Sequence, residues 1–306
     1  MKIILMGQQA FGKSTLEKFY KETDHEIVAV YCAPDKEGKP LDPVKEYALN
    51  ENLPVFQPSN FKDKEVLDQM RSHNSDLCVM AYVTIFVPEE ARDIPQHGSI
   101  CFHPSLLPLH RGPSSINWPI SLGSKKTGLT IFYPNDGLDE GDILLQKEVD
   151  IGDDETLGDI YFNKIFPLGV DACIESANLL NEGNAPRIKQ DETKATYESW
   201  FKKDIARIDW KKPGKEVYNL IRASNPQPGA WAEFMDEEYV FLDTKFSEEQ
   251  SAEHFPGQIM EINEENVKIA VKGGFLIVTR FKSKDQGKLY VKDMNTAVFT
   301  EGDLFS

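Results

Sequence analysis

Five short apolar segments, separated by helical patterns, occupy the first half of the chain and constrain its fold more than any other feature. They are KIILM (2–6), EIVAVYC (26–32), DLCVMAY (76–82), SICFH (99–103) and GLTIFY (128–133). Amphipathic helical patterns fall between several of them, at 13–22 and 42–52. Strands that are apolar on both faces belong to sheets covered by helices on both sides. The alternation predicts an α/β fold with a Rossmann-like, mostly parallel sheet, whose ligands bind at the carboxyl ends of the strands.

The pattern changes near residue 200. A helical pattern at 157–180 and a polar connector at 181–197 are followed by short strand-like segments with Gly, Asn and acidic turns between them. These segments are YVFLDTKF (239–246), QIMEI (258–262), VKIAVKG (267–273), FLIVTRF (275–281) and KLYVKDM (288–294). Such spacing predicts a smaller, β-rich domain with an OB-like barrel. We therefore expect two domains, at residues 1–203 and 204–306.

The charge balance limits the partners of the chain. Lys and Arg number 34 against 50 Asp and Glu, a formal charge of −16. Such a chain repels nucleic-acid phosphates, so tRNA is an unfavoured partner, although a local basic patch could still bind it.

Other sequence features predict the compartment. No apolar run approaches the roughly 20 residues of a membrane helix, and the start shows no signal-peptide pattern. The cysteines, with no paired spacing, are Cys32, Cys78, Cys101 and Cys173. Unpaired cysteines in apolar runs favour reduced thiols. We therefore expect a cytoplasmic protein without a membrane partner.

The segment GQQAFGKST (7–15) matches the phosphate-binding pattern G-x-x-x-x-G-K-[ST] between a strand and a helix. A nucleotide triphosphatase also needs an Asp at the end of a second strand to hold Mg²⁺, and DLCVMAY ends without one. Bulky residues such as Gln8 hinder backbone amides from closing on a phosphate. We predict an accidental match without ATP, in which Gly7 and Gly12 are turn residues and Phe11 points towards a cleft.

The densest group of chemically active side chains lies in GSICFHPSLLPLHRGPSSINW (98–118) and TGLTIFYPNDGLDEGDILLQ (127–146). His103 ends a strand, and Cys101 shares its face because side chains alternate. Three Asp residues, among them Asp139, occupy a glycine-broken loop after another strand. A carboxylate beside an imidazole fixes its tautomer and stabilises its protonated form. The spacing alone leaves two interpretations open: an acid–base pair, or a structural His and a solvated acidic turn.

HPSLLPLHRG followed by DGLDEGDILLQ resembles the signature of the folate-dependent formyltransferases, and the likeness covers nearly the whole chain. IDWKKPGKEVYNLIRASNPQPGAWAEF (208–234) is similar to the start of the C-terminal domain in methionyl-tRNA formyltransferase. The segments MGQQAFG, PDKEGKP, DDETL and EGNAPR are most similar to the N-terminal hydrolase domain of 10-formyltetrahydrofolate dehydrogenase. The resemblance implies a folate-binding catalytic domain followed by a C-terminal domain.

The resemblance also implies site residues. His103 and Asp139 stand at the catalytic His and Asp of the family motif, while Cys101 stands where the motif usually has Asn. A thiol is a much poorer hydrogen-bond donor to a developing oxyanion than an amide. The hydrolase domain of the dehydrogenase also lacks the Asn, so Cys101 favours that branch, unless the site has decayed. The residues implied at the pterin are Met80, Ala81, Ile85, Phe86, Val87, Asn135, Asp136, Gly137 and Leu138.

The implied activity is removal of the N10 formyl group from 10-formyltetrahydrofolate, by hydrolysis to tetrahydrofolate and formate or by transfer to a partner. The folate is the small-molecule ligand, and neither a metal nor ATP is needed. Three alternatives are a methionyl-tRNA formyltransferase, a sugar-nucleotide N-formyltransferase and a folate-binding module with weak catalysis. A downstream carrier or aldehyde-dehydrogenase domain is the further partner that the resemblance suggests.

Overall fold

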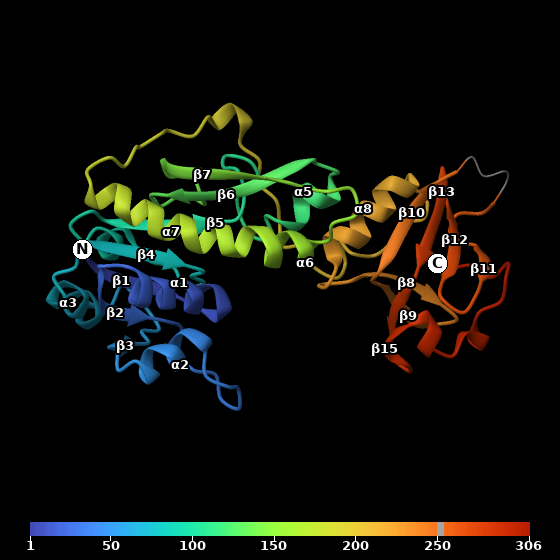
Figure 1. Ribbon diagram of the computed structural model, residues 1–306, viewed down its shortest axis with the longest axis horizontal. Helices are drawn as coiled ribbons and strands as arrows, with labels where there is room; N and C mark the ends of the chain where they lie inside the picture. Colours follow the sequence, from blue (N-terminus) through green and yellow to red (C-terminus); the bar gives the residue numbers. More distant parts are fainter. Residues whose placement is uncertain (250–253) are drawn as a thin grey trace. The chain divides into compact units, whose positions relative to one another are not determined.

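The computed structural model describes residues 1–249 and 254–306, which form two compact units (Figure 1). The first unit comprises residues 1–112, 128–149 and 164–197, and the second comprises 113–127, 150–163 and 198–306. Two segments from the first 163 residues therefore belong with the C-terminal residues. A domain boundary at residue 204 stays a prediction.

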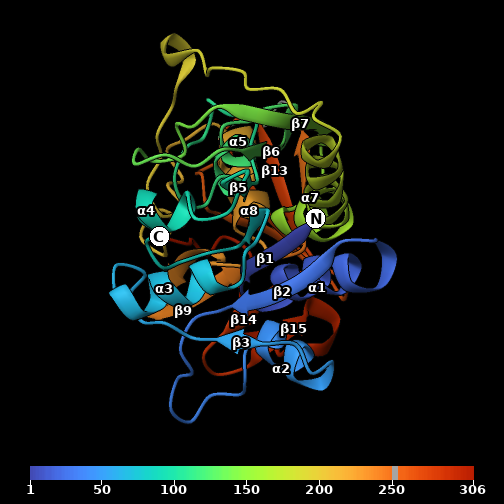
Figure 2. The same ribbon diagram turned by 90° about the vertical axis from the view of Figure 1, so that its left-hand side faces the viewer.

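A seven-stranded sheet in the order β3-β2-β1-β4-β5-β6-β7 forms the centre of the first unit (Figure 2). The strands are β1 Lys2–Gly7, β2 Glu26–Tyr31, β3 Val55–Phe56, β4 Leu77–Ala81, β5 Ser99–His103, β6 Lys126–Phe132 and β7 Ile143–Asp150. Strands β1 to β5 pair in parallel, whereas β6 is antiparallel to β5. The predicted Rossmann-like, mostly parallel sheet is confirmed, and its strand order reverses between β1 and β4, where such sheets bind ligands.

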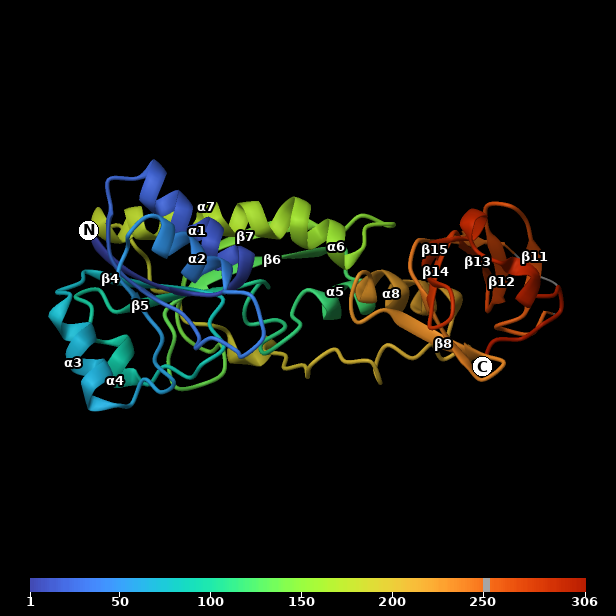
Figure 3. The ribbon, with the colours of Figure 1, turned by 90° about the horizontal axis from the view of Figure 1, so that it is seen from below.

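Helices cover both faces of this sheet (Figure 3). They are α1 Gln9–Glu22, α2 Pro43–Asn50, α3 Lys64–Ser72, α4 Glu89–Arg92 and α7 Phe166–Asn181. Alternate residues of β1 enter different cores: Ile3 and Leu5 pack with α1, α2 and α7, whereas Ile4 and Met6 pack with α3 and α4. Burial of both strand faces explains why the sequence shows continuous apolar runs.

The helical pattern predicted at 157–180 forms three consecutive elements. Helix α6 spans Leu157–Ile160, a π-helical turn spans Tyr161–Ile165, and α7 follows. Pro167 stands at the start of α7, where it has no amide hydrogen to donate to the preceding turn. A wide turn directly before a proline accommodates this missing hydrogen bond.

The segment GQQAFGKST forms the end of β1 and the start of α1, which begins at Gln9. Gly12 therefore lies inside the helix, and its prediction as a turn residue is wrong. A Cβ on Gly7 would lie 2.6 Å from the carbonyl oxygen of Ala81, and one on Gly12 would lie 2.8 Å from Cγ2 of Val44. Both glycines allow α1 to pack closely on its neighbours.

Phe11 is 2 % exposed and belongs to the core between α1, β5 and α7. Its ring stacks on Phe102 with centroids 4.2 Å apart and meets the edge of Phe166 at 5.5 Å. The prediction that Phe11 points towards a cleft is therefore wrong. The amide of Gln9 donates to the Asp42 carboxylate at 3.0 Å, so a phosphate at this helix end would meet a negative charge.

The second unit contains helix α5 Asn117–Ser121, helix α8 Gly214–Ser224 and, among its described residues, two four-stranded sheets. The strands are β8 Ala230–Phe234, β9 Glu237–Phe241, β10 Thr244–Glu248, β11 Ile259–Ile262, β12 Val267–Val271, β13 Gly274–Val278, β14 Arg280–Ser283 and β15 Gly287–Tyr290. Their orders are β10-β13-β12-β11 and β15-β14-β9-β8, and side chains from both sheets share one core. Only Thr279 separates β13 from β14, so the chain changes sheets there, as at the corners of small barrels. The predicted β-rich character is confirmed.

Helix α8 ties the two earlier segments into the second unit. The side-chain amide of Asn117 donates to the carbonyl oxygen of Ala223 at 2.8 Å. The Tyr218 hydroxyl donates to Asp154 at 2.8 Å, and Arg222 donates to the carbonyl oxygen of Glu155 at 2.7 Å. These contacts place residues 113–127 and 150–163 beside α8 rather than in the first unit. Across the described residues, every helix is too short or too polar to cross a membrane.

Candidate active site

His103 is the last residue of β5 and lies at the carboxyl edge of the sheet. Its side chain is buried, and its Nε2 lies 2.9 Å from the carbonyl oxygen of His110. Its Nδ1 lies 3.6 Å from Oδ2 of Asp139. Both ring nitrogens therefore face oxygen atoms, and the contact to His110 is within hydrogen-bond distance.

Asp139 belongs to the loop that joins β6 to β7. Its φ is +55°, the left-handed region that Asp adopts more readily than most residues. The amide of Gly112 donates to its Oδ2 at 2.8 Å, so this oxygen meets both a backbone amide and the imidazole of His103. The structure thus brings together the two residues that the sequence singles out. Their catalytic roles stay predictions.

Cys101 lies two residues before His103 on β5, on the face that packs against Met80 and Cys78. Burial raises the pKa of its thiol, and the Asp139 carboxylate raises this pKa further. The thiol is therefore neutral at physiological pH. A neutral thiol is a weak donor, so the site lacks a strong side-chain donor at this position.

The residues predicted at the pterin lie at the end of β4, in the loop that follows it, and in the loop that follows β6. Met80 and Ala81 end β4 and are buried, Val87 is buried, and Ile85 is half-buried. Phe86 is 59 % exposed, with the Lys62 ammonium 5.5 Å from its ring centroid.

The second loop, 135–138, is mostly exposed, with Leu138 at 55 %. The side chain of Asn135 accepts the amide of Gly137 at 3.0 Å, a local turn that shapes the loop. Exposed apolar side chains on both loops provide a surface on which a flat heterocycle could pack. Ligand contacts by these nine residues stay predictions.

Arg92, which the sequence reasoning missed, joins these two loops. Its side chain is buried, and it donates to the carbonyl oxygen of Val87 and to Oδ1 of Asp136, both at 2.7 Å. No short sequence pattern marks Arg92, because its neighbours Glu89 and Glu90 are exposed charged residues and its own burial depends on the fold.

A hollow of about 190 Å³ lies beside Arg92 and the start of the second loop, and its lining includes Asn135, Asp142 and Arg187. The Arg187 guanidinium stacks 3.8 Å from the ring centroid of Tyr133.

The first loop is also held by the turn after β1. Gln8 of this turn donates to the Thr84 hydroxyl at 2.6 Å. Within residues 1–249 and 254–306, no three His, Cys, Asp or Glu side chains gather as metal ligands would.

Comparison with known proteins gives two adjacent family matches. The model described as "Formyl transferase" matches residues 1–168, and that described as "Formyl transferase, C-terminal domain" matches 201–297. Cytosolic 10-formyltetrahydrofolate dehydrogenase of Xenopus laevis is 40% identical over 267 residues, which are 86% of this chain and 29% of that protein. The chain thus spans less than a third of the dehydrogenases that it matches. Methionyl-tRNA formyltransferase of Clostridioides difficile (strain 630) is 34% identical over 296 residues, 95% of each chain.

Solved structures share the fold at low sequence identity. An N-formyltransferase from Helicobacter canadensis has a TM-score of 0.67 at 19% identity, with 94% of this chain and 100% of that one covered. HypX from Aquifex aeolicus, in complex with tetrahydrofolic acid, has a TM-score of 0.64 at 19% identity, with 95% of this chain and 46% of that one covered. Since the first family model covers more than half of the chain and a relative matches almost all of it, this chain belongs to the formyl transferase family.

Proposed function

We propose that this chain removes the formyl group from N10 of 10-formyltetrahydrofolate and releases formate and tetrahydrofolate, with water as the acceptor. The observation that carries the proposal is the pair of His103 and Asp139, whose Nδ1 and Oδ2 lie 3.6 Å apart at the carboxyl edge of the sheet. The names of the relatives, which include 10-formyltetrahydrofolate dehydrogenases, support the folate as substrate.

The geometry of the pair supports a hydrolytic sequence of steps. Asp139 orients the imidazole and holds a water, whose oxygen attacks the formyl carbon. The imidazolium of His103 stabilises the oxygen on which negative charge develops. As the C–N bond breaks, the imidazolium proton passes to N10, and the proton released by the attacking water restores the imidazolium. The products are formate and tetrahydrofolate, with no co-reactant besides water.

Cys101 supports water over an amine acceptor. In the family motif this position usually holds Asn, and the resemblance links its loss to the hydrolase branch. The neutral, poorly donating thiol leaves oxyanion stabilisation to His103 and to backbone amides. Hydrolysis by this site would therefore proceed with fewer donors than transfer by the full motif.

Methionyl-tRNA formyltransferase is the second candidate, because one such relative matches 95% of both chains and includes the C-terminal unit. The formal charge of −16 argues against a tRNA ligand.

A single assay separates the candidates. The purified chain is mixed with 10-formyltetrahydrofolate, and tetrahydrofolate is followed by absorbance and formate by an enzymatic assay, with no added acceptor. Formate release that His103→Asn abolishes supports hydrolysis. Turnover only after addition of Met-tRNA would indicate a methionyl-tRNA formyltransferase. Turnover only after addition of an amino-sugar nucleotide would indicate a sugar-nucleotide N-formyltransferase. Tight tetrahydrofolate binding without turnover under any condition would identify a binding module.

We also propose a cytoplasmic location and a carrier or aldehyde-dehydrogenase domain as a partner. The names of several relatives contain "cytosolic", and their greater length supports an additional domain. Fractionation of the source cells tests the location. Co-expression with a separate aldehyde-dehydrogenase domain, followed by an assay for oxidation of the formyl group, tests the partner.

A further inference from the structure

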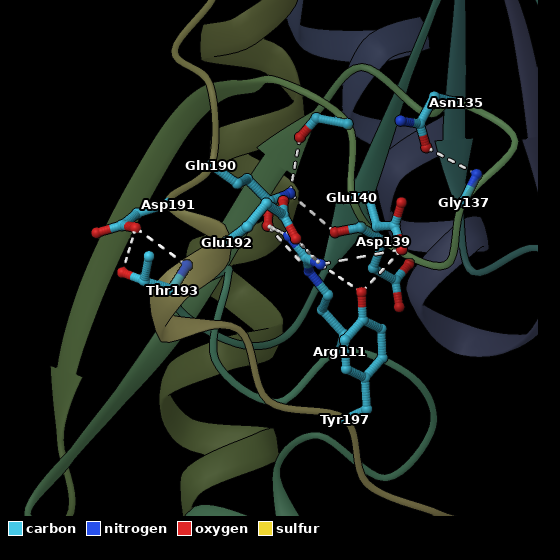
Figure 4. A network of polar contacts seen from close by, with 11 residues as sticks. Arg111, Asn135, Gly137, Asp139, Glu140, Gln190, Asp191, Glu192, Thr193 and Tyr197 are labelled. Carbon is cyan, nitrogen blue, oxygen red and sulfur yellow. Dashed lines mark hydrogen bonds and ion pairs between the residues drawn. The ribbon is translucent and has the colours of Figure 1, made fainter.

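Two residues of one loop, His110 and Gly112, contact the His103–Asp139 pair. The carbonyl oxygen of His110 lies 2.9 Å from Nε2 of His103, and the amide of Gly112 donates to the Asp139 carboxylate at 2.8 Å. Between them, the Arg111 side chain turns in a third direction, towards the segment 188–197 (Figure 4). This segment is called the brace below.

Gln190 of the brace forms hydrogen bonds to the loop that carries Asp139. Its side-chain nitrogen donates to the carbonyl oxygens of Asp139 and Gly141 at 2.8 and 2.7 Å, so both amide hydrogens hold one loop (Figure 4). Its side-chain oxygen accepts from Nε and Nη2 of Arg111 at 3.1 and 2.8 Å. The guanidinium thus fixes the orientation of the amide, because only the oxygen can face two donors.

Arg111 is itself fully buried and held by the brace. It donates to both carboxylate oxygens of Glu192, at 2.9 and 2.7 Å, and to the Tyr197 hydroxyl. That hydroxyl donates in turn to Glu140 at 2.8 Å, next to Asp139 in the chain. A bidentate arginine–carboxylate pair is among the most rigid polar contacts in proteins.

Backbone contacts tie both ends of the brace to the same unit. At its start, Ile188 exchanges two backbone hydrogen bonds with Ile143, at 2.8 and 3.0 Å. Near its end, the amide of Arg111 donates to the carbonyl oxygen of Thr196 at 3.0 Å. The amide of Thr196 donates to the carbonyl oxygen of Pro108 at 3.1 Å. The brace is thus anchored on either side of the point where Gln190 meets the Asp139 loop.

We propose that the brace positions the Asp139 carboxylate against His103, with Gln190 and Arg111 as positioning residues that do not touch the substrate. The inference rests on the proposed function, because it assigns a purpose to the same pair. Asp139 holds a left-handed backbone conformation, and such conformations persist where the surroundings over-determine them. Gln190 bonds the carbonyls of residues 139 and 141 and so fixes the loop on both sides of Glu140. A shift of about 1 Å in a reacting group can lower a rate about 100-fold.

The test uses the full chain and the variant Gln190→Glu. A glutamate retains an oxygen for Arg111 but, when ionised, has no hydrogen for the carbonyls of Asp139 and Gly141. Gln190→Met removes both interactions and serves as the second variant. The matched control is Gln57→Glu, because Gln57 likewise donates to two oxygens, the carbonyl oxygen of Ala33 at 2.7 Å and Oδ1 of Asp35 at 2.9 Å, and accepts from Lys45 at 2.7 Å.

For Gln190→Glu we expect kcat for formate release to fall about 10- to 100-fold, with a much smaller change in KM and a chain that stays folded by circular dichroism. The same substitution in an Asp139→Asn background should cost nothing further, because the positioned group is already lost. The control should retain wild-type kcat. A rise in KM as large as the fall in kcat, or an additive loss in the double variant, would overturn the proposal in favour of a purely structural role.

A second measurement does not depend on turnover. Hydrogen exchange of peptides that cover Gly112 and residues 139–141 should accelerate in Gln190→Glu and not in Gln57→Glu. If the wild-type chain releases no formate, the proposed function fails, and this exchange alone decides whether the brace holds the Asp139 loop. Unchanged exchange in Gln190→Glu would refute the brace whatever the activity.

Discussion

The guanidinium of Arg92 lies 2.7 Å from the carboxylate of Asp136 and joins the loop after β4 to the loop after β6. Arg92 is buried, whereas Asp136 is largely exposed, so a substitution of Asp136 removes the carboxylate partner of a buried guanidinium while it changes a residue on the surface. The two loops are those predicted to hold the pterin, and the pair therefore sets the distance between them.

Asp136→Ala should weaken tetrahydrofolate binding about tenfold, since a hydrogen bond to a charged group contributes about 1.5 kcal/mol or more. The catalytic rate at saturating folate should change little. Quenching of intrinsic fluorescence measures the affinity. Glu90→Ala is the control, because Glu90 pairs with Arg71 at 2.7 Å on the exposed surface. Equal affinities in all three proteins would contradict the loop assignment.

Asp139→Asn and His103→Asn should each lower kcat about 10²- to 10⁴-fold, the range expected for loss of a general acid–base group. Both side chains are largely enclosed but polar, so the amides should preserve the fold. Stopped-flow absorbance with 10-formyltetrahydrofolate gives kcat, and calorimetry with tetrahydrofolate shows whether the site is intact. A variant with near-wild-type kcat would remove that residue from the mechanism.

Cys101→Ala should leave kcat almost unchanged, because the buried thiol is neutral and donates weakly. The small residue also avoids overpacking against Met80. Steady-state kinetics beside the wild-type chain test this expectation. A large loss of kcat with normal folate affinity would instead show that the thiol takes part in the reaction.

The remaining thiols should reduce stability at high pH. Burial raises the pKa of Cys32 to about 11 and those of Cys78 and Cys173 to about 12, from an ordinary value of 9.0. In the unfolded chain these thiols ionise near pH 9, whereas in the folded chain they stay neutral. The free energy of unfolding attributable to them is therefore constant below pH 9 and falls as the pH rises towards 11 and 12.

Urea unfolding at pH 7.5, 9 and 10.5 measures this dependence, and a Cys173→Ala variant should show a shallower fall above pH 9. The native chain should also react slowly with a thiol reagent at pH 8, because the thiolate is the reactive species. Rapid labelling of three buried thiols without denaturant would contradict the burial that underlies the prediction.

Much of the fold can be predicted from the sequence because the strands of the first unit are buried on both faces. Their apolar runs give β1, β2, β4, β5 and β6 to within a few residues. The failures lie where a local pattern does not determine the start of an element. Helix α1 begins at Gln9 instead of residue 13, and this shift places Gly12 in the helix and turns Phe11 into the core.

The site likewise contains residues that the sequence predicts and contacts that it does not. His103 could be found because a strand-ending His stands in a recognisable segment, and Asp139 because a family motif surrounds it. The contacts that hold them have no local signal. Arg92 meets Asp136 across 44 positions, and Arg111 meets Gln190 across 79. Such pairs depend on which loops the folded sheet brings together, and no short pattern in the sequence indicates that.

The run His110, Arg111 and Gly112 limits how this loop can vary. A carbonyl, a side chain and an amide in consecutive positions each serve a different target. Surface loops usually tolerate insertions and deletions. Here the addition or removal of a single residue would move the carbonyl, the side chain and the amide away from all three of their partners at once. The loop can therefore vary in composition at its other positions but hardly in length.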